Sequence, residues 1–312
     1  MKLIKDLTEI SIKAQTAVTL GKFDGLHLGH QKLIHQVLKK KEKGYLSTIF
    51  TFDRPPQKLL TGSENKIILT NEEKQKMLED IQIDLFVQCP FTKEIAQLEP
   101  EDFVKDILKK KLHVGYLVVG TDFRFGYQRR GDIDLLNKLA KDCHYHLMVL
   151  AKEQQEGHNI SSTYIKELIS QGEVEKASEF LGYPYFLSGK VIRGKQLGRA
   201  MGIPTANIIP DERKILPPNG VYASKFWVDG HFYYGMTNIG LRPTVEDTIE
   251  KNVETYLFDF EKDIYEKEIL VELLEYERKE IKFDSVEALK RQLSMDKEKT
   301  QEILEKYRGK KA

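Results

Sequence analysis

The segment from Gly21 to His30 combines residue types that suit phosphate binding. It follows an apolar run, Thr16 to Leu20, that predicts a buried strand, and it precedes an amphipathic helical pattern. Glycines in such a corner let the backbone approach a phosphate, and free N–H groups at the helix start face the anion. His27 and His30 lie where this helix begins and can donate hydrogen bonds to phosphate oxygens. A zinc site and a helix-capping role are the alternatives for these two histidines.

A second polar segment ends on Thr205 and Asn207 and carries three glycines at a spacing of four, at positions 194, 198 and 202. Residues 205 and 207 alternate on a predicted strand, so both side chains point to one side. A hydroxyl and an amide oxygen on one side suit Mg²⁺, which prefers hard oxygen ligands and accompanies phosphates. A glycine-rich barrel corner with a capping Thr and Asn fits the spacing equally well.

Glu254 lies in a predicted strand and shares its side with Tyr256 and Phe258. A carboxylate that projects among aromatic side chains is a candidate general base. An exposed strand glutamate without a catalytic role is the alternative.

The first half of the chain alternates predicted strands and helices, which favours a parallel, doubly wound sheet. The predicted strands cover 16–20, 47–52, 85–88, 116–120 and 145–150, and the predicted helices cover 31–40, 71–81, 101–111 and 132–142. In such sheets ligands bind beyond the carboxyl ends of the strands. Two loops, 21–30 and 120–126, are expected at that edge.

Two more helices, near 161–169 and 174–181, precede a predicted domain boundary, giving domains 1–183 and 184–312. Beyond this boundary strands dominate, at 186–192, 221–228, 232–235, 253–258 and 269–276, with helices only at 286–293 and 297–307. Many strands joined by turns indicate a small antiparallel barrel capped by helices.

The composition narrows the class of protein. A length of 312 residues favours two domains, and a net charge of +1 gives no electrostatic case for nucleic-acid binding. Two distant cysteines fit a reduced cytoplasmic environment. There is no signal-peptide core and no apolar run of the ~20 residues that a membrane span needs. We expect a cytoplasmic enzyme, monomeric or transiently homo-oligomeric, without a membrane or nucleic-acid partner.

Taken together, these segments resemble the bacterial bifunctional riboflavin kinase/FAD synthetase family over nearly the whole chain. Residues 21–30, 120–126 and 160–163 resemble its adenylylation motifs, and 202–207 resembles the ATP/Mg²⁺ loop of its kinase module. Further matches lie at 220–223, 238–244, 254–260, 263–265 and 278–283. The resemblance implies a Rossmann-like α/β nucleotidylyltransferase domain followed by a β-barrel kinase domain.

The implied chemistry has two steps. The kinase module transfers the γ-phosphoryl group of ATP to riboflavin, with Glu254 as the base and with Thr205, Asn207 and Mg²⁺ holding the phosphates. The other module joins the FMN phosphate to the α-phosphorus of ATP and releases pyrophosphate, with His27 and His30 stabilising charge. The substrates and products are therefore riboflavin, FMN, FAD and ATP.

The resemblance also implies binding residues. Those for ATP and its phosphates are Gly21, Phe23, Asp24, Gly25, Gly29, Ser162, Thr163, Lys166, Gly194, Gly198, Arg199 and Gly202. Those for the flavin are Asp122, Phe123, Arg124, Phe125, Asn238 and Arg278. Either phenylalanine also fits a place in the core.

The chain departs from the family pattern in the adenylylation half. Arg54-Pro55-Pro56 replaces Pro-His-Pro, and Tyr164-Ile165-Lys166 replaces Arg-Ile-Arg. Lysine keeps the charge but loses the planar fork that grips phosphate in two places. A riboflavin kinase with a weak or inactive adenylyltransferase domain is therefore an alternative. A nucleotidylyltransferase for another substrate and a flavin-sensing nucleic-acid regulator are more distant ones.

Overall fold

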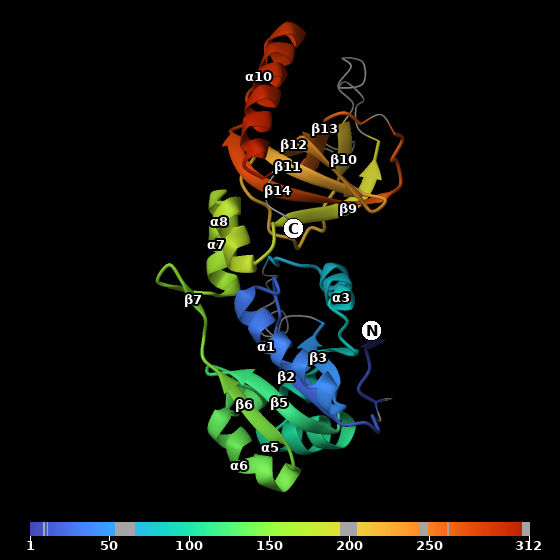
Figure 1. Cartoon of the computed structure of the whole chain (residues 1–312), viewed down its shortest axis with the longest axis vertical. Helices are drawn as coiled ribbons and strands as arrows, with labels where there is room; N and C mark the ends of the chain where they lie inside the picture. Colours follow the sequence, from blue (N-terminus) through green and yellow to red (C-terminus); the bar gives the residue numbers. More distant parts are fainter. Residues whose placement is uncertain are drawn as a thin grey trace. The chain divides into compact units, whose positions relative to one another are not determined.

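The computed structural model describes residues 1–8, 10, 12–53, 66–193, 205–243, 249–260 and 262–307. The chain divides into two compact units, 1–162 and 163–312 (Figure 1). Helices α7 (Ser162–Gln171) and α8 (Val174–Leu181) fall almost entirely in the second unit. The sequence places the boundary after these helices, at 183/184, and that boundary stays a prediction.

The first unit is built on a six-stranded parallel sheet in the order β1-β4-β3-β2-β5-β6. Its strands are β1 (Lys2–Ile4), β2 (Thr16–Leu20), β3 (Leu46–Phe52), β4 (Leu85–Cys89), β5 (Val114–Gly120) and β6 (His146–Leu150). Every residue of β2 and β4 is buried, as expected for strands covered on both faces. The predicted parallel, doubly wound sheet is confirmed.

The strand order reverses beside β2, because β3 and β4 lie on one side of it and β5 and β6 on the other. Strands β2 and β5 pair directly, so their carboxyl ends border the switch point where such sheets bind ligands. The loops that follow these two strands, 21–27 and 121–126, are the two that the sequence indicates for ligand binding.

Helices and short turns connect these strands. They are α1 (Leu28–Lys39), η1 (Lys41–Lys43), α3 (Asn71–Asp80), α4 (Lys93–Ala96), α5 (Pro100–Asp102), η2 (Phe103–Lys111), η3 (Tyr127–Arg129) and α6 (Ile133–Cys143). The helix predicted at 101–111 is realised as α5 and a wider π-type helix, η2. A two-stranded hairpin of β7 (Gln154–Gln155) and β8 (His158–Asn159) follows β6.

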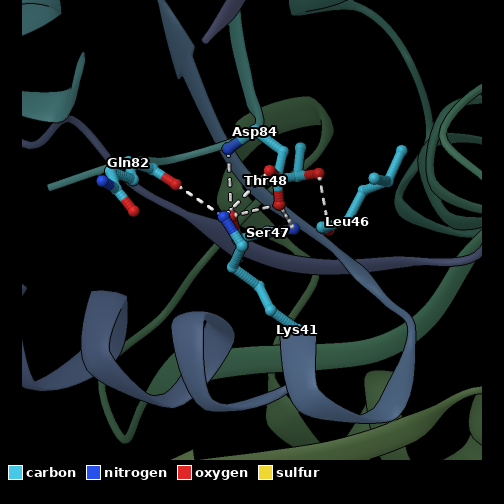
Figure 2. A network of polar contacts seen from close by, with 6 residues as sticks. All are labelled: Lys41, Leu46, Ser47, Thr48, Gln82 and Asp84. Carbon is cyan, nitrogen blue, oxygen red and sulfur yellow. Dashed lines mark hydrogen bonds and ion pairs between the residues drawn. The ribbon is translucent and has the colours of Figure 1, made fainter.

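A polar network ties the amino-terminal ends of β3 and β4, at the edge opposite the ligand loops (Figure 2). Asp84 Oδ2 accepts hydrogen bonds from the Ser47 backbone N–H at 2.9 Å and from the Ser47 hydroxyl at 2.8 Å. Lys41 Nζ donates to Asp84 Oδ1 at 2.9 Å and to the Gln82 carbonyl at 2.8 Å. Burial opposes the charged form of Asp84, but these hydrogen bonds outweigh it and lower the pKa of the carboxyl.

The second unit contains a closed antiparallel barrel in the order β10-β13-β12-β11-β14-β9. Its strands are β9 (Phe186–Ile192), β10 (Thr205–Ile208), β11 (Gly220–Val228), β12 (His231–Pro243), β13 (Ile249–Leu257) and β14 (Glu268–Arg278). The predicted small antiparallel barrel is confirmed.

Two predicted features of this unit are wrong. Strand β12 reaches Pro243 rather than ending near residue 235, so Asn238 lies within a strand. The two helices predicted at 286–293 and 297–307 form one helix, α10 (Val286–Glu305), whose buried residues all lie in its C-terminal half and which projects beyond the barrel over part of its length (Figure 1). A tertiary contact explains its continuity, because Asp296, at the expected break, is buried against β14.

That contact is a buried ion pair between α10 and β14. Arg278 Nε donates to Asp296 Oδ1 at 2.7 Å, and Arg278 Nη2 donates to Asp296 Oδ2. Gln292 Nε2 donates to Asp296 Oδ1 at 2.7 Å, and Thr300 Oγ1 donates to Glu277 Oε2 at 2.7 Å. Asp296 is only 2% exposed, and the hydrogen bonds from Arg278 and Gln292 compensate the burial of its carboxylate.

Asp296→Asn should destabilise the second unit by about 3 kcal/mol, because the largely buried Arg278 loses the carboxylate that compensates its charge. Trp227 in β11 is the only tryptophan of the chain, so its fluorescence during urea unfolding of the full protein reports this unit. Asp284→Asn, at an exposed position before α10, is the matched control and should change the midpoint little. Equal midpoints for the two variants would show that the ion pair contributes nothing.

Candidate functional site

The loop between β2 and α1 is held in a strained conformation. Gly25 has a φ of 87°, and the non-glycine residues Phe23 and Leu26 have φ values of 48° and 39°. Residues other than glycine rarely adopt such positive φ values. A backbone conformation of this kind persists only where the surrounding structure enforces it. Phe23 is 0% exposed and Leu26 is 3% exposed, so core packing supplies that constraint.

His27 and His30 lie together at the start of α1. The imidazole rings stack with centroids 3.6 Å apart, and His27 Nδ1 accepts the backbone N–H of His30 at 3.3 Å. This bond caps the helix and leaves the neutral ring of His27 with its proton on Nε2. A Cβ at Gly29 would lie 3.2 Å from His27 Nδ1, so this position favours glycine.

Both histidines are neutral at pH 7. Burial lowers the pKa of His27 from 6.5 to about 4, and the charge of Asp24 only partly opposes the shift. Burial also holds the pKa of His30 well below its ordinary value; a proton on His27, at a pH low enough to add one, and the charge of Lys74 both act in the same direction. Within the described part of the chain, the buried Nδ1 of His30 has no hydrogen-bond partner.

Asp24 and Ser162 stabilise the same loop. Asp24 Oδ1 accepts the backbone N–H groups of Ile68 at 2.8 Å and Leu69 at 3.4 Å. The Ser162 hydroxyl donates to the Asp24 carbonyl at 2.7 Å. A carboxylate repels a phosphate, so this geometry favours a positioning role for Asp24 over the phosphate contact that the resemblance implies.

Lys74 is a residue that the sequence reasoning missed. It lies on α3, is 5% exposed, and its Nζ donates to the Lys22 carbonyl at 3.4 Å. Burial lowers the pKa of Lys74, and the nearby charge of Asp24 opposes the shift. A sequence signal exists, because Lys74 lies one turn before the buried Leu78 and so on the apolar side of the helix.

The loop after β5 carries most of the residues that the resemblance assigns to the flavin. Asp122 pairs with Lys152 at 2.8 Å, and Arg124 pairs with Asp132 at 2.7 Å. Phe125, at 7% exposure, belongs to the core, which favours the core alternative for this ring. Phe123 stacks on Phe125 with centroids 5.5 Å apart and is only partly buried.

The remaining predicted residues of the adenylylation site belong to different parts of the chain. Gly21 donates its N–H to the Phe50 carbonyl at 3.2 Å and so extends the pairing of β2. Thr163 and Lys166 lie on α7 in the second unit, where the ring of Tyr164 packs edge-on against Phe180 at 5.1 Å. Several predicted positions lie outside the described residues: Arg54, Pro55, Pro56, Gly194, Gly198, Arg199 and Gly202.

A second polar cluster lies on the outer face of the barrel, where β10 pairs with β13. Thr205 Oγ1 donates to Glu254 Oε1 at 2.5 Å, and Asn207 Nδ2 lies 3.5 Å from both of these oxygens. Asn207 and Glu254 are register partners, so backbone pairing holds them side by side. Val253 and Thr255 are buried inside the barrel, which directs the half-buried Glu254 outward.

Asn238 flanks Glu254 on the other side, because β12 pairs these two residues. A Cβ at Gly240 would lie 2.2 Å from Glu280 Oε1 and 3.3 Å from Asn238 Nδ2, so a larger residue here would displace the exposed Glu280 side chain. Arg278 instead directs its guanidinium to Asp296 and to the Lys279 carbonyl. This arrangement favours a structural role for Arg278 over the implied flavin contact.

The donors of the barrel cluster suit a hard cation. A hydroxyl, an amide and a carboxylate converge from Thr205, Asn207 and Glu254, and such oxygen-bearing groups are the ligands that Mg²⁺ prefers. Among the described residues no three His, Cys, Asp or Glu side chains form a metal-binding group.

In the part of the chain that the structure describes, none of the helices has the length and apolarity required to cross a membrane.

Comparisons with known proteins match both units. The FAD synthetase family model matches residues 9–164, and the riboflavin kinase model matches residues 181–304. A bifunctional riboflavin kinase/FMN adenylyltransferase of Buchnera aphidicola is 37% identical over 95% of this chain and 96% of its own length. The protein of the same name from Listeria monocytogenes is 36% identical over 93% and 92%.

A solved structure is similar over the same extent. It is described as a macrolide-efflux protein from Streptococcus pneumoniae, is 29% identical, and superposes with a TM-score of 0.86 over 96% of this chain and 98% of that one. The two family models together cover most of the chain, and the names of these curated relatives combine both activities in one protein. The chain therefore belongs to the family of bifunctional riboflavin kinase/FMN adenylyltransferases.

Proposed function

We propose that this protein phosphorylates riboflavin to FMN at the barrel and adenylylates FMN to FAD at the parallel sheet. One observation carries the proposal: the chain holds two separate polar clusters, each built for a different phosphate chemistry. One cluster centres on a half-buried carboxylate, Glu254, and the other on two neutral histidines at a helix start.

In the kinase step the 5′-hydroxyl oxygen of riboflavin attacks the γ-phosphorus of ATP. The O–H proton passes to Glu254, and the bond to the β-phosphate oxygen breaks, so that ADP leaves with the electron pair. An alcohol is a poor nucleophile at neutral pH, so a base assists the attack. Oε1 of Glu254 already accepts from Thr205, and Oε2 receives no hydrogen bond from any residue that the structure describes. Oε2 is therefore the oxygen assigned to the proton.

Thr205 and Asn207 are the residues that would hold Mg²⁺ beside this carboxylate. When bound, Mg²⁺ neutralises charge on the ATP phosphates and so favours the transfer. The side chains of β10 supply the oxygen donors for it, while Glu254 keeps an oxygen for the proton. Asn238 pairs with Glu254 from the other side, which supports a role for it in orienting the flavin alcohol.

In the adenylylation step a phosphate oxygen of FMN attacks the α-phosphorus of ATP and pyrophosphate leaves. This nucleophile is already ionised, so no strong base is needed. His27 offers the Nε2–H as a donor to a phosphate oxygen, and the backbone N–H groups at the start of α1 face the anion. The buried Lys74 adds a positive charge that acts on His30.

The direct test is a product time course from riboflavin and Mg-ATP in which FMN and FAD are separated. We expect FMN to rise first and FAD to follow. FMN without FAD, also when FMN itself is supplied, would favour the kinase with an inactive adenylyltransferase domain. No FMN from riboflavin would exclude the kinase assignment.

We also propose that the protein acts in the cytoplasm on free small molecules, as a monomer or transient oligomer. Support comes from its two cysteines, Cys89 and Cys143, which are buried and free.

Glu254→Gln should lower FMN formation by about 100-fold or more, because the amide accepts no proton. The amide oxygen still accepts from Thr205, so the barrel should stay folded by Trp227 fluorescence. FAD formation from supplied FMN serves as the internal control and should stay unchanged. Unchanged FMN formation would remove Glu254 from the role of base.

Lys74→Met should lower FAD formation from FMN by about tenfold or more, since it removes a charge beside the histidines but keeps the length of the side chain. Lys76→Met, at an exposed position of the same helix, is the matched control. Kinase activity of both variants should match that of the wild type. Equal FAD formation by the two variants would assign Lys74 a packing role only.

The stability of the first unit should fall as the pH drops from about 6.5 to about 4. In this window the unfolded chain binds a proton at His27 that the folded protein does not, which costs about 3 kcal/mol over the full shift. Hydrogen exchange of the α1 amides measures this. His27→Asn keeps a helix-capping oxygen and should make the profile less steep, while the contribution of the buried His30 remains. Identical pH profiles for the two proteins would contradict the buried neutral state of His27.

A further inference from the structure

The barrel cluster includes a residue that neither the motifs nor the proposed reaction accounts for. Asn252 lies on β13 two residues before Glu254, so both side chains project from the same outer face. Its Nδ2 donates a hydrogen bond of 3.0 Å to Oδ1 of Asn207 on the neighbouring strand β10. This contact reaches the amide that the proposed function assigns to the cation.

The contact fixes the direction in which the Asn207 amide points. With Oδ1 held by Asn252, the Nδ2 of Asn207 faces Thr205 Oγ1 and Glu254 Oε1, each at 3.5 Å. An amide binds a hard cation through its oxygen and not through its NH₂ group. In this orientation Asn207 presents its NH₂ group to the Glu254 carboxylate, which is the favourable arrangement when no cation is bound.

The opposite orientation suits the metal-bound state. If both amides turn by half a rotation, Asn207 Nδ2 donates to Asn252 Oδ1, and Asn207 Oδ1 faces Thr205 and Glu254. The bond between the two amides is kept with its direction reversed. Without a cation this state brings an amide oxygen close to the oxygens of Thr205 and Glu254, which is unfavourable, whereas a cation among the same oxygens stabilises it.

Asn252 is able to follow this rotation. Its Oδ1 is buried and accepts no hydrogen bond within the described ranges of the chain, so no second contact there fixes the amide in its present direction. Its backbone partner on β12 is Gly240, which has no side chain that would obstruct the amide.

We propose that Asn252 is a positioning residue of the kinase metal site, whose amide holds Asn207 Oδ1 toward the cation, and that both amides turn over when the cation binds. The proposal rests on the proposed kinase function for the identity of the cation site. It assigns Asn252 no contact with substrate or metal.

The experiment measures Mn²⁺ affinity in the presence of saturating ADP, by water-proton relaxation on the full-length protein. Asn252→Leu has a similar shape but no amide, so Asn207 stays turned toward Glu254, and Mn²⁺ should bind about tenfold or more weakly. Asn252→Asp only accepts hydrogen bonds when ionised, so it holds Asn207 in the metal-binding orientation, and Mn²⁺ affinity should be kept or increased.

A double-mutant cycle separates this mechanism from the added charge of aspartate. In an Asn207→Ala background, both substitutions at residue 252 should lose their effect on Mn²⁺ affinity. A tighter Mn²⁺ affinity of the aspartate variant that persists in this background would mean a simple charge effect and would overturn the proposal. Wild-type affinity in Asn252→Leu would overturn it as well.

A spectroscopic readout follows the rotation itself. In protein labelled with ¹⁵N at the asparagine side chains, the NH₂ signals of Asn207 and Asn252 should shift together as Mg²⁺ is added with ADP. Stationary signals at saturation would contradict the turnover. These measurements need no turnover of riboflavin. A wild-type protein that makes no FMN would therefore refute the proposed function, whereas the double-mutant cycle would still test the role of Asn252. Trp227 fluorescence checks that each variant is folded.

Discussion

Backbone pairing between strands is the constraint on which both sites depend. In the barrel, the register of β10 and β13 sets Asn207 beside Glu254, so their side chains meet on the outer face. A slip of one residue would turn them inward, to where Thr255 is buried. In the sheet, the direct pairing of β2 and β5 brings two loops to one edge. The chemical groups are thus positioned by hydrogen bonds in which their own side chains take no part.

The two clusters differ in burial, and the difference matches the reactions proposed for them. A base must be able to receive a proton from the substrate, and Glu254 is only half-buried, with Thr205 donating a hydrogen bond to one of its two oxygens. Adenylyl transfer begins from an ionised phosphate and needs donors rather than a base. Neutral histidines meet that need, and burial keeps His27 and His30 neutral. The adenylylation site therefore tolerates an enclosed setting that would impair the kinase base.

Local signals predicted local features well. Strands β2 and β9 and helix α8 have the predicted bounds, because apolar runs within these elements, or a glycine directly after β2 and α8, mark them in the sequence. The wrong predictions concern features that depend on contacts distant in the sequence. One example is the Arg278–Asp296 contact, which lies where the sequence predicts a break in α10. Lys74 and Asn252 were missed for the same reason. Helical spacing indicates that Lys74 faces the core, but the roles of this lysine and of Asn252 depend on Asp24 and Asn207, which the fold brings from other parts of the chain.

The departures from the family pattern bear on the adenylylation half, and the structure gives them a physical reading. Tyr164 packs against Phe180 inside the second unit, so an aromatic residue at this position contributes to helix packing. Replacement of arginine by Lys166 removes a bidentate fork but keeps a cation. Among the described residues, Lys74 is a positive charge that acts on His30, and it lies within the first unit, at neither of the departed positions. One source of positive charge at His30 is therefore present without the missing arginines, which argues for retention of adenylyl transfer.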